Sequence, residues 1–301
     1  MAFYSIYYDI QFSGVKKVSK TSAKRRRNGR LLMKALCFDI GGTNLKYGIV
    51  ENYKVLYFKK ERTDKYNLEE QINRIINSFE HDAISIGFAG VVKENKILFA
   101  PNLKTYQERE LKINTDKRIV IDNDANLFTL GEYANLKNYE NVIGITLGTG
   151  VGGGIVIGGK LYKGKGGAGE IGHITVVQDG ALCNCGKLGC IEAYIGESYF
   201  PRYFENVFGK KLSANEIYNL ALRNDSRAVE FWKWFSEKLS ILINNLVCIF
   251  DPEVIVIGGG VSNAFDVFKN FLNVKGNVVV KKSELGEYAS LIGGYFALMN
   301  I

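Results

Sequence analysis

The chain has 301 residues, of which 47% are hydrophobic and 23% are charged, and its formal net charge is +8. A chain of this length can bury a large core and usually divides into two domains. It contains no apolar run of the ~18 residues that a membrane-spanning helix needs. The composition therefore favours a cytoplasmic, two-lobed protein without a membrane partner.

The positive charge is concentrated at the N-terminus. Residues 1–33 contain eight Lys or Arg and one Asp, so the rest of the chain is almost neutral. We therefore expect no specific nucleic-acid partner. Residues 1–32 are interpreted as a disordered or non-native extension, with Met33 as a candidate start. The alternative is a functional basic tail that targets the protein or grips phosphates.

The first predicted elements are strands. "ALCFDI" from Ala35 is typical of a buried strand, and "LKYGIV" and "KVLYFKKE" follow it, which together predict a β-meander. Residues 67–80 place Leu68, Ile72, Ile75, Ile76 and Phe79 on one helical face. "AISIGFAG" then returns to a strand.

The remainder of the chain alternates between strands and helices. Residues 117–136 pass from a strand to a helix, and residues 142–162 form a glycine-rich hairpin. Residues 227–250 are a long amphipathic helix that precedes the strand 253–261. This alternation predicts an α/β fold.

Three glycine-rich turns follow apolar strands: "DIGGTN" (39–44), "LGTGVGGG" (147–154) and "IGGGV" (257–261). Any one of them could be only a tight turn. Three such turns favour a nucleotide site, because glycine lets backbone amides approach phosphates closely. Asp39 would then orient a hydrated Mg²⁺ ion. The second turn is formally G-x-G-x-x-G, but a strand follows it, which excludes a dinucleotide fingerprint.

A cluster of metal-binding residue types occupies the middle of the chain: His173, Cys183, Cys185 and Cys190. Their number and softness predict a four-coordinate, structural zinc site. A disulfide is the alternative, although it would leave one cysteine unpaired. Cys37 and Cys248 are expected to be ordinary buried thiols.

These motifs together resemble the ROK family of sugar kinases and repressors. "FDIGGTN", "IDNDANLFTLGE", "LGTGVGGGIVIGGKLYKGKGGAGEIGH", "CNCGKLGCIEAY" and "DPEVIVIGGGVS" match its motifs in order. The resemblance implies a two-lobed actin-like ATPase (ribonuclease H-like) fold with nucleotide and sugar in the interlobe cleft, and a homodimer. The expected lobes are 33–141, with helix 286–301 packing back on it, and 142–285, with a zinc loop at 173–190.

The resemblance also implies roles for individual residues. Asp124 corresponds to the general base, although Asp at a strand-to-helix junction is also a common helix N-cap. The implied sugar-binding residues are Asn102, Asn123, Glu170, His173 and Glu192. The implied residues for ATP and Mg²⁺ are Asp39, Gly41, Gly42, Thr43, Asn44, Lys46, Gly148, Thr149, Gly150, Gly258 and Gly259.

The activity implied is transfer of phosphate from ATP to the 6-hydroxyl of a hexose, with glucose as the leading substrate. N-acetylmannosamine, fructose and β-glucosides stay open as substrates, because Asp122, Ile195 and Gly196 depart from the family pattern near the sugar site. Polyphosphate also stays open as the donor. A sugar-sensing transcriptional regulator is the alternative of another class. Residues 1–32 are too few for the DNA-binding domain that a regulator needs.

Overall fold

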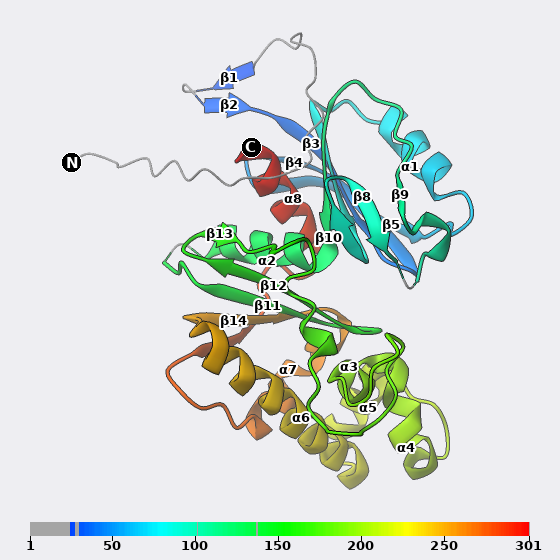
Figure 1. The fold of residues 1–301 in the computed structure, drawn as a ribbon, viewed down its shortest axis with the longest axis vertical. Helices are drawn as coiled ribbons and strands as arrows, with labels where there is room; N and C mark the ends of the chain where they lie inside the picture. The colour runs from blue at the N-terminus through cyan, green and yellow to red at the C-terminus, as the bar shows by residue number, and fades with distance from the viewer. Residues whose placement is uncertain (1–24, 28–29, 101, 137, 301) are drawn as a thin grey trace, which may run out of the picture. The chain divides into compact units, whose positions relative to one another are not determined.

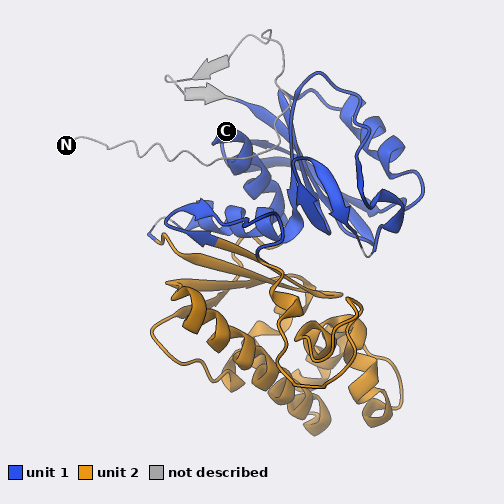
Figure 2. Ribbon diagram, in the orientation of Figure 1, with its two compact units in different colours: residues 1–138, 156–168, 287–301 blue, residues 139–155, 169–286 orange. Residues whose placement is uncertain are grey.

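The computed structural model describes residues 25–27, 30–100, 102–136 and 138–300. The chain forms two compact units (Figure 2). Unit 1 combines the chain up to residue 138 with residues 156–168 and 287–301, and unit 2 combines residues 139–155 and 169–286. Residues 156–168 therefore pack with unit 1, although they lie within the stretch 142–285 that the sequence assigned to one lobe.

A short hairpin precedes the main sheet of unit 1. Strands β1 (Arg25–Arg27) and β2 (Arg30–Leu32) pair in antiparallel fashion. The rest of the predicted disordered extension, residues 1–24, 28 and 29, lies outside the described residues.

The sheet of unit 1 has the strand order β10-β6-β3-β4-β5. Figure 1 labels four of these strands, β3, β4, β5 and β10. Strands β3 (Lys34–Ile40), β4 (Asn44–Glu51) and β5 (Lys54–Arg62) are antiparallel neighbours, which confirms the predicted meander. Strand β6 (Ala83–Phe88) runs parallel to β3, and β10 (Arg118–Asn123) runs parallel to β6. The ends of β3 and β10 therefore lie at the same edge of this sheet.

Alternation along β3 separates the two faces of this sheet. Leu36 and Phe38 belong to a buried cluster that also contains the apolar face of helix α1 (Leu68–Asn77). The helix ends earlier than predicted, but Phe79 still packs against that cluster. Residues of β3 on the other face lie toward helices α2 and α8, because successive side chains of a strand point to opposite faces.

Helices α2 (Asp124–Asn135) and α8 (Ala289–Met299) touch backbone to backbone. A Cβ atom added to Gly293 would lie 1.7 Å from the Leu127 carbonyl oxygen, and one added to Gly131 would lie 2.0 Å from that of Ala289. Both positions therefore accept only glycine at this spacing, and α8 is fixed closely against α2.

Smaller elements complete unit 1. Strands β7, β8 and β9 form a three-stranded sheet, and β13 pairs with the end of β12. Their bounds, with those of the short 3-10 helices, are β7 (Val91–Lys93), β8 (Lys96–Phe99), η1 (Lys104–Tyr106), β9 (Arg109–Glu110), β13 (Lys160–Leu161) and η6 (Gly286–Tyr288), the last of which precedes α8.

The second five-stranded sheet has the order β13-β12-β11-β14-β15, and all of it except β13 and the end of β12 belongs to unit 2. Strands β11 (Val142–Leu147), β14 (Val254–Gly258) and β15 (Val279–Lys282) run parallel. Strand β12 (Val151–Ile157) neighbours β11, so residues 148–150 form the turn of a hairpin, as predicted.

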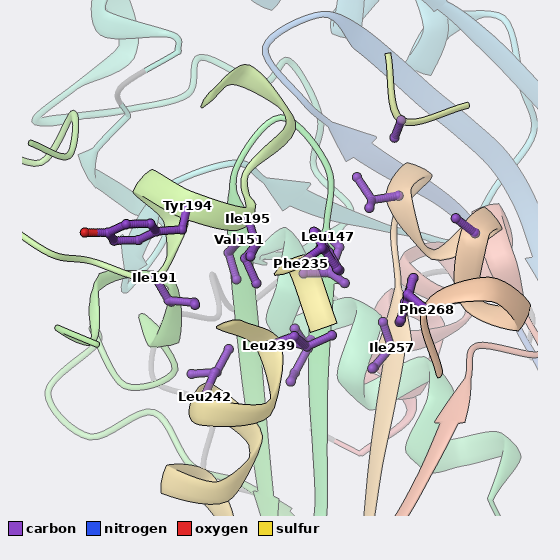
Figure 3. Close-up of a cluster of buried hydrophobic side chains, with 14 of the residues drawn as sticks. Leu147, Val151, Ile191, Tyr194, Ile195, Phe235, Leu239, Leu242, Ile257 and Phe268 are labelled. Atoms are coloured by element: carbon purple, nitrogen blue, oxygen red, sulfur yellow. The ribbon is translucent and has the colours of Figure 1, made fainter. Parts of the chain in front are cut away.

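Helix α6 (Ser226–Phe250) forms much of the core of unit 2. Its N-cap, Asp225, accepts hydrogen bonds from the Arg227 and Ala228 amides. Figure 3 shows Phe235, Leu239 and Leu242 of this helix in the cluster that includes residues of β11, β12 and β14. The other helices of the unit are η2 (Ile171–His173), α3 (Glu192–Ile195), η3 (Glu197–Tyr199), α4 (Phe200–Phe208), α5 (Ala214–Leu222), η4 (Gly260–Ala264), α7 (Phe265–Phe268) and η5 (Lys269–Phe271).

The two thiols outside the cluster differ in exposure. Cys37 is buried in β3, as predicted, but the prediction for Cys248 is wrong, because its side chain is exposed. The buried positions near the end of α6 are Leu242, Ile243 and Leu246. Cys248 comes two residues after Leu246 and so lies on the opposite side of the helix.

Among the helices that the structure describes, none has both the length and the apolar character required to cross a membrane.

Candidate functional site

The first glycine-rich turn connects β3 to β4 in unit 1. The Gly41 amide donates to the Asn44 carbonyl oxygen at 2.9 Å, which closes the turn. A Cβ atom added to Gly42 would lie 2.6 Å from the Cβ of Asn102, so the predicted sugar-binding residue packs directly against this turn. Thr43 and Asn44 are exposed. The turn is therefore exposed beside Asn102.

Asp39 and Lys46 form an ion pair at the base of this turn. They are register partners across β3 and β4, and Lys46 Nζ lies 3.1 Å from Asp39 Oδ2. Burial alone would lower the pKa of Lys46, but the carboxylates of Asp39, Glu287 and Asp124 together raise it. Lys46 therefore remains a cation at this end of the sheet.

Asp124 is the first residue of helix α2, directly after the end of β10. The N-cap of this helix is Asn123, whose Oδ1 accepts a hydrogen bond from the Asn126 amide at 3.0 Å, while its Nδ2 donates to the Gly90 carbonyl. The interpretation of Asp124 as the N-cap is therefore wrong. The Asp124 carboxylate accepts a hydrogen bond from the Ala125 amide at 3.0 Å.

The other two glycine-rich turns lie together in unit 2. Strands β11 and β14 are parallel neighbours, so Leu147 and Gly258 end at the same edge of the sheet. The Gly148 amide donates to the Gly150 carbonyl at 3.0 Å, and Gly148 has open space where a side chain would begin. Gly259 has a φ of 84°, a conformation that favours glycine. A Cβ atom added to Gly259 would lie 2.2 Å from the Leu147 carbonyl oxygen, so the two turns are in contact at this edge, beside the exposed Thr149.

Glu192 contacts the second glycine-rich turn from the start of α3. Its Oε2 accepts a hydrogen bond from the Val151 amide at 2.9 Å. A Cβ atom added to Gly150 would lie 2.3 Å from the same oxygen. The glycine at position 150 is therefore what allows the carboxylate to reach the turn.

The four predicted metal ligands converge, with one ligand atom from each within 4.8 Å of all the others: His173, Cys183, Cys185 and Cys190. The Sγ atoms of Cys185 and Cys190 are 3.7 Å apart, and Cys183 Sγ is 3.7 Å from His173 Nδ1. A tetrahedral zinc ion, with bonds of about 2.3 Å to sulfur and 2.0–2.1 Å to nitrogen, requires edges of about 3.6–3.8 Å. The donor set and these two edges therefore fit zinc.

The thiols of this cluster differ in acidity. Burial raises the pKa of Cys190 to about 12. Burial also acts to raise the pKa of Cys185, but hydrogen bonds from the Lys187 amide and the neighbouring thiols lower it overall. Cys185 is thus the thiol that ionises most easily.

His173 has different neighbours on its two ring nitrogens. Its Nδ1 faces Cys183, whereas its Nε2 lies 3.9 Å from Oε2 of Glu170. Glu192 Oε1 lies 3.7 Å from Cys183 Sγ. Of the three predicted sugar-binding residues of unit 2, His173 therefore belongs to the Cys-His cluster, and Glu170 and Glu192 each lie beside one of its members.

Two charged residues of unit 1 were not predicted from the sequence. Glu287 Oε1 lies 2.9 Å from Lys60 Nζ and 3.9 Å from Lys46 Nζ. Lys163 Nζ lies 2.5 Å from Oδ2 of Asp122, one residue before the N-cap of α2. Lys163 stands in the charged, glycine-rich run "KGKGG", the one signal that could have drawn attention to it.

Comparisons with known proteins agree with one another. The model of the ROK family matches residues 35–297. The chain is 32% identical over 259 residues to an N-acetyl-D-glucosamine kinase of Pectobacterium atrosepticum, covering 77% of this chain and 85% of the relative. It is 31% identical over 290 residues to a glucokinase of Thermotoga maritima, and the match covers 85% of this chain and 91% of that relative.

A solved structure shows the same likeness. The ROK family glucokinase of Streptomyces griseus, in complex with glucose and AMPPNP, superposes with a TM-score of 0.78 and 30% identity. The match covers 88% of this chain and 98% of that chain.

Proposed function

Because the chain belongs to the ROK family, we propose that it is a hexose kinase, which transfers the γ-phosphoryl group of ATP to the 6-hydroxyl of a glucose-type sugar. Its mixed α/β fold is that of ROK sugar kinases, the two-lobed actin-like ATPase fold. The observation that carries the proposal is the position of Asp124. Asn123 supplies the capping hydrogen bond of α2, so capping does not account for the Asp124 carboxylate.

In the proposed reaction, Asp124 is the general base. It accepts the proton of the sugar's 6-hydroxyl while that oxygen forms a bond to the γ-phosphorus and the bond between the γ-phosphorus and ADP breaks. The products are the sugar 6-phosphate and ADP, and the proton resides on Asp124. Phosphoryl transfer depends chiefly on positioning and charge neutralisation. The only proton to be removed is that of the attacking hydroxyl, so the reaction needs no second base.

The glycine-rich turns of the two units are the proposed phosphate-binding elements. Backbone amides at such turns suit phosphate oxygens, and the cation of Lys46 adds a positive charge in unit 1. Asp39 is only 9% exposed, and its carboxylate is proposed to orient a hydrated Mg²⁺ ion. When bound, the ion would neutralise charge on the phosphate oxygens.

The proposed sugar contacts are the side chains assigned from the sequence. In unit 2, Glu170 and Glu192 are carboxylates, which accept charge-assisted hydrogen bonds from hydroxyl groups. His173 faces Cys183 with Nδ1 and Glu170 with Nε2. In unit 1, Asn102 and Asn123 are the candidates, and the amide of Asn123 retains hydrogen-bonding capacity beyond its two bonds within the protein.

We also propose that His173, Cys183, Cys185 and Cys190 hold a structural zinc ion. Four protein ligands leave no open position on a tetrahedral ion, so its contribution is to the conformation of the loop rather than to bond breaking. The chain is further proposed to form a homodimer, for which sedimentation velocity of the purified protein is the test.

The identity of the sugar is decided by experiment. Relatives at about the same identity include glucokinases and N-acetyl-D-glucosamine kinases, so the comparisons favour neither sugar. We would measure ADP release from ATP and Mg²⁺ by the full chain with glucose, N-acetylglucosamine, N-acetylmannosamine, mannose, fructose and cellobiose. One of these sugars is expected to give a rate at least tenfold above the sugar-free rate.

The control variant is Asp124→Asn. It is expected to lower kcat by about 10²–10⁴-fold while the dissociation constant of the sugar changes by less than about threefold. Near-normal turnover by Asp124→Asn would overturn the assignment of the base. The absence of a rate with every sugar would overturn the proposed function.

A further inference from the structure

Lys163 and Asp122 form an ion pair next to the start of α2. Asp122 is the fifth residue of β10 and is only 1% exposed. Lys163 follows β13, and its side chain is 25% exposed. Its Nζ lies 2.5 Å from Asp122 Oδ2. Both residues belong to unit 1.

The two oxygens of Asp122 have different surroundings. Oδ1 accepts hydrogen bonds from the Asn123 amide at 2.8 Å and from Asn126 Nδ2 at 3.0 Å. Oδ2 is buried, and within the part of the chain that the structure describes no group donates a hydrogen bond of acceptable geometry to it. The ammonium of Lys163 is therefore what offsets the buried charge, since an unpaired buried carboxylate is strongly unfavourable.

The partners of Asp122 are the residues that form the cap of α2. Asn123 accepts from the Asn126 amide, and both residues bond to Asp122 Oδ1. The first turn of the helix, which begins with Asp124, is thus linked through Asp122 to Lys163. A shift of Lys163 would be transmitted to Asp124 through these bonds.

Lys163 also organises its own segment. Its carbonyl oxygen accepts hydrogen bonds from the Gly166 amide at 2.8 Å and the Ala168 amide at 3.3 Å. The segment 163–168 leads directly into Gly169 and Glu170 in the chain. One residue therefore anchors this turn through its backbone and the start of α2 through its side chain.

We propose that Lys163 is a positioning residue for the phosphoryl transfer: through Asp122 it holds the first turn of α2, and with it Asp124, in the orientation that accepts the substrate's proton. This inference rests on the proposed function. It concerns a residue that contacts no reacting atom, so its effect is expected on kcat rather than on binding.

The first experiment compares three variants of the full chain. Lys163→Met is expected to lower kcat about 100-fold, the size of effect that a small misplacement of a catalytic group produces, with KM for ATP changed less than about threefold. Lys163→Arg keeps a cation and is expected to retain kcat within about threefold. Lys165→Met removes an exposed lysine of the same segment and is the matched control, with unchanged kcat and KM.

A double variant separates positioning from neutralisation of a buried charge. Asp122→Asn/Lys163→Met contains no unpaired charge, so it is expected to melt within a few degrees of the wild type even where Lys163→Met alone folds poorly. Its kcat is expected to stay low, because the link to the turn 163–168 is still missing. Wild-type kcat in the double variant would overturn the proposal.

Amide hydrogen exchange tests the link without reference to catalysis. In the double variant, exchange at Asn123–Asn126 and in residues 163–168 is expected to be at least tenfold faster than in the wild type and in Lys165→Met. Unchanged exchange in both segments would overturn the link, whether or not the wild type phosphorylates a sugar. A wild type without hexose-dependent ADP release, by contrast, would refute the proposed function, and with it the role of Lys163 in catalysis.

Discussion

The Glu192 carboxylate lies between the second glycine-rich turn and the Cys-His cluster: Oε2 accepts a hydrogen bond from the Val151 amide at 2.9 Å, and Oε1 lies 3.7 Å from Cys183 Sγ. A residue assigned from the sequence only to sugar binding therefore also supports a proposed phosphate-binding turn. The proposed sugar contact depends on the charge of the carboxylate, whereas the bond from Val151 needs only an acceptor oxygen, so substitutions can separate the two roles.

Glu192→Gln preserves an oxygen that can accept from Val151 but removes the charge. We expect KM for the sugar to rise about tenfold, because a charge-assisted hydrogen bond is lost, while KM for ATP stays within about twofold. Glu192→Ala removes the acceptor as well, and KM for ATP is then expected to rise about fivefold. Steady-state kinetics with each substrate varied will check this. An unchanged KM for ATP in Glu192→Ala would contradict the supporting role.

The Cys-His cluster predicts that the purified protein contains about one zinc ion per chain. Cys185→Ser removes one of four ligands and is expected to lower the zinc content measured by mass spectrometry and to reduce the melting temperature by several degrees. Cys248→Ser is the matched control, because its thiol is exposed on α6 outside the cluster. A zinc content in Cys185→Ser equal to that of the control would show that the cluster does not bind the metal.

Close contact between α2 and α8 predicts intolerance of a methyl group at position 293. A Cβ atom there would lie 1.7 Å from the Leu127 carbonyl oxygen, so Gly293→Ala is expected to lower the free energy of unfolding by about 1–3 kcal/mol. Gly167→Ala, where no atom lies within 4 Å of the added Cβ, is expected to change it by less than about 0.5 kcal/mol. Urea denaturation measures the free energy of unfolding of both variants. Equal values for the two would refute backbone contact between these helices.

Glu61 predicts a dependence of stability on pH. The Lys59 ammonium, with Tyr47 and Gln71, lowers the pKa of Glu61 from 4.5 to about 2, although partial burial opposes this. A carboxyl whose pKa is lowered on folding stabilises the protein above pH about 4.5, and that contribution is lost as the pH falls toward 2. Because Lys59 and Arg74 are exposed, screening limits it to about 1–2 kcal/mol.

Glu61→Gln is therefore expected to be less stable than the wild type at pH 7, with the difference narrowing from pH 5 to pH 3. Urea denaturation at several pH values measures it. Glu70→Gln, at an exposed position of α1, is the control and is expected to show a small, constant difference. A difference for Glu61→Gln that stays constant down to pH 3 would contradict the assigned ion pair.

Hydrophobic periodicity predicted the helices and strands well. The prediction of burial failed for a side chain whose exposure depends on how its helix packs. The apolar residues of α1 lie on one buried face because a 3.6-residue period requires it. The nature of the Cys248 side chain suggested burial, but its angular position on α6 places it in solvent. The exposure of Cys248 is therefore determined by its position around the helix axis and not by its residue type.

The candidate site was predictable where its residues are close in sequence. The Cys-His ligands are linked by three short segments, two of which contain glycine, so their convergence follows from local chain geometry. The cap of α2 was assigned one residue too late, because Asn123 and Asp124 are adjacent and both suit an N-cap. The contact of Lys163 with Asp122 joins distant parts of the chain, and no local pattern specifies such a partner.

The packing of α8 against α2 also bears on the order in which the protein folds during synthesis. All of unit 2 lies between these helices in the chain, so its segments leave the ribosome before α8 does. Until α8 arrives, α2 and one face of the unit 1 sheet lack their apolar cover. We expect unit 2 to acquire its tertiary structure first and unit 1 to close last, with the nascent chain dependent in the interval on chaperones that shield an uncovered sheet.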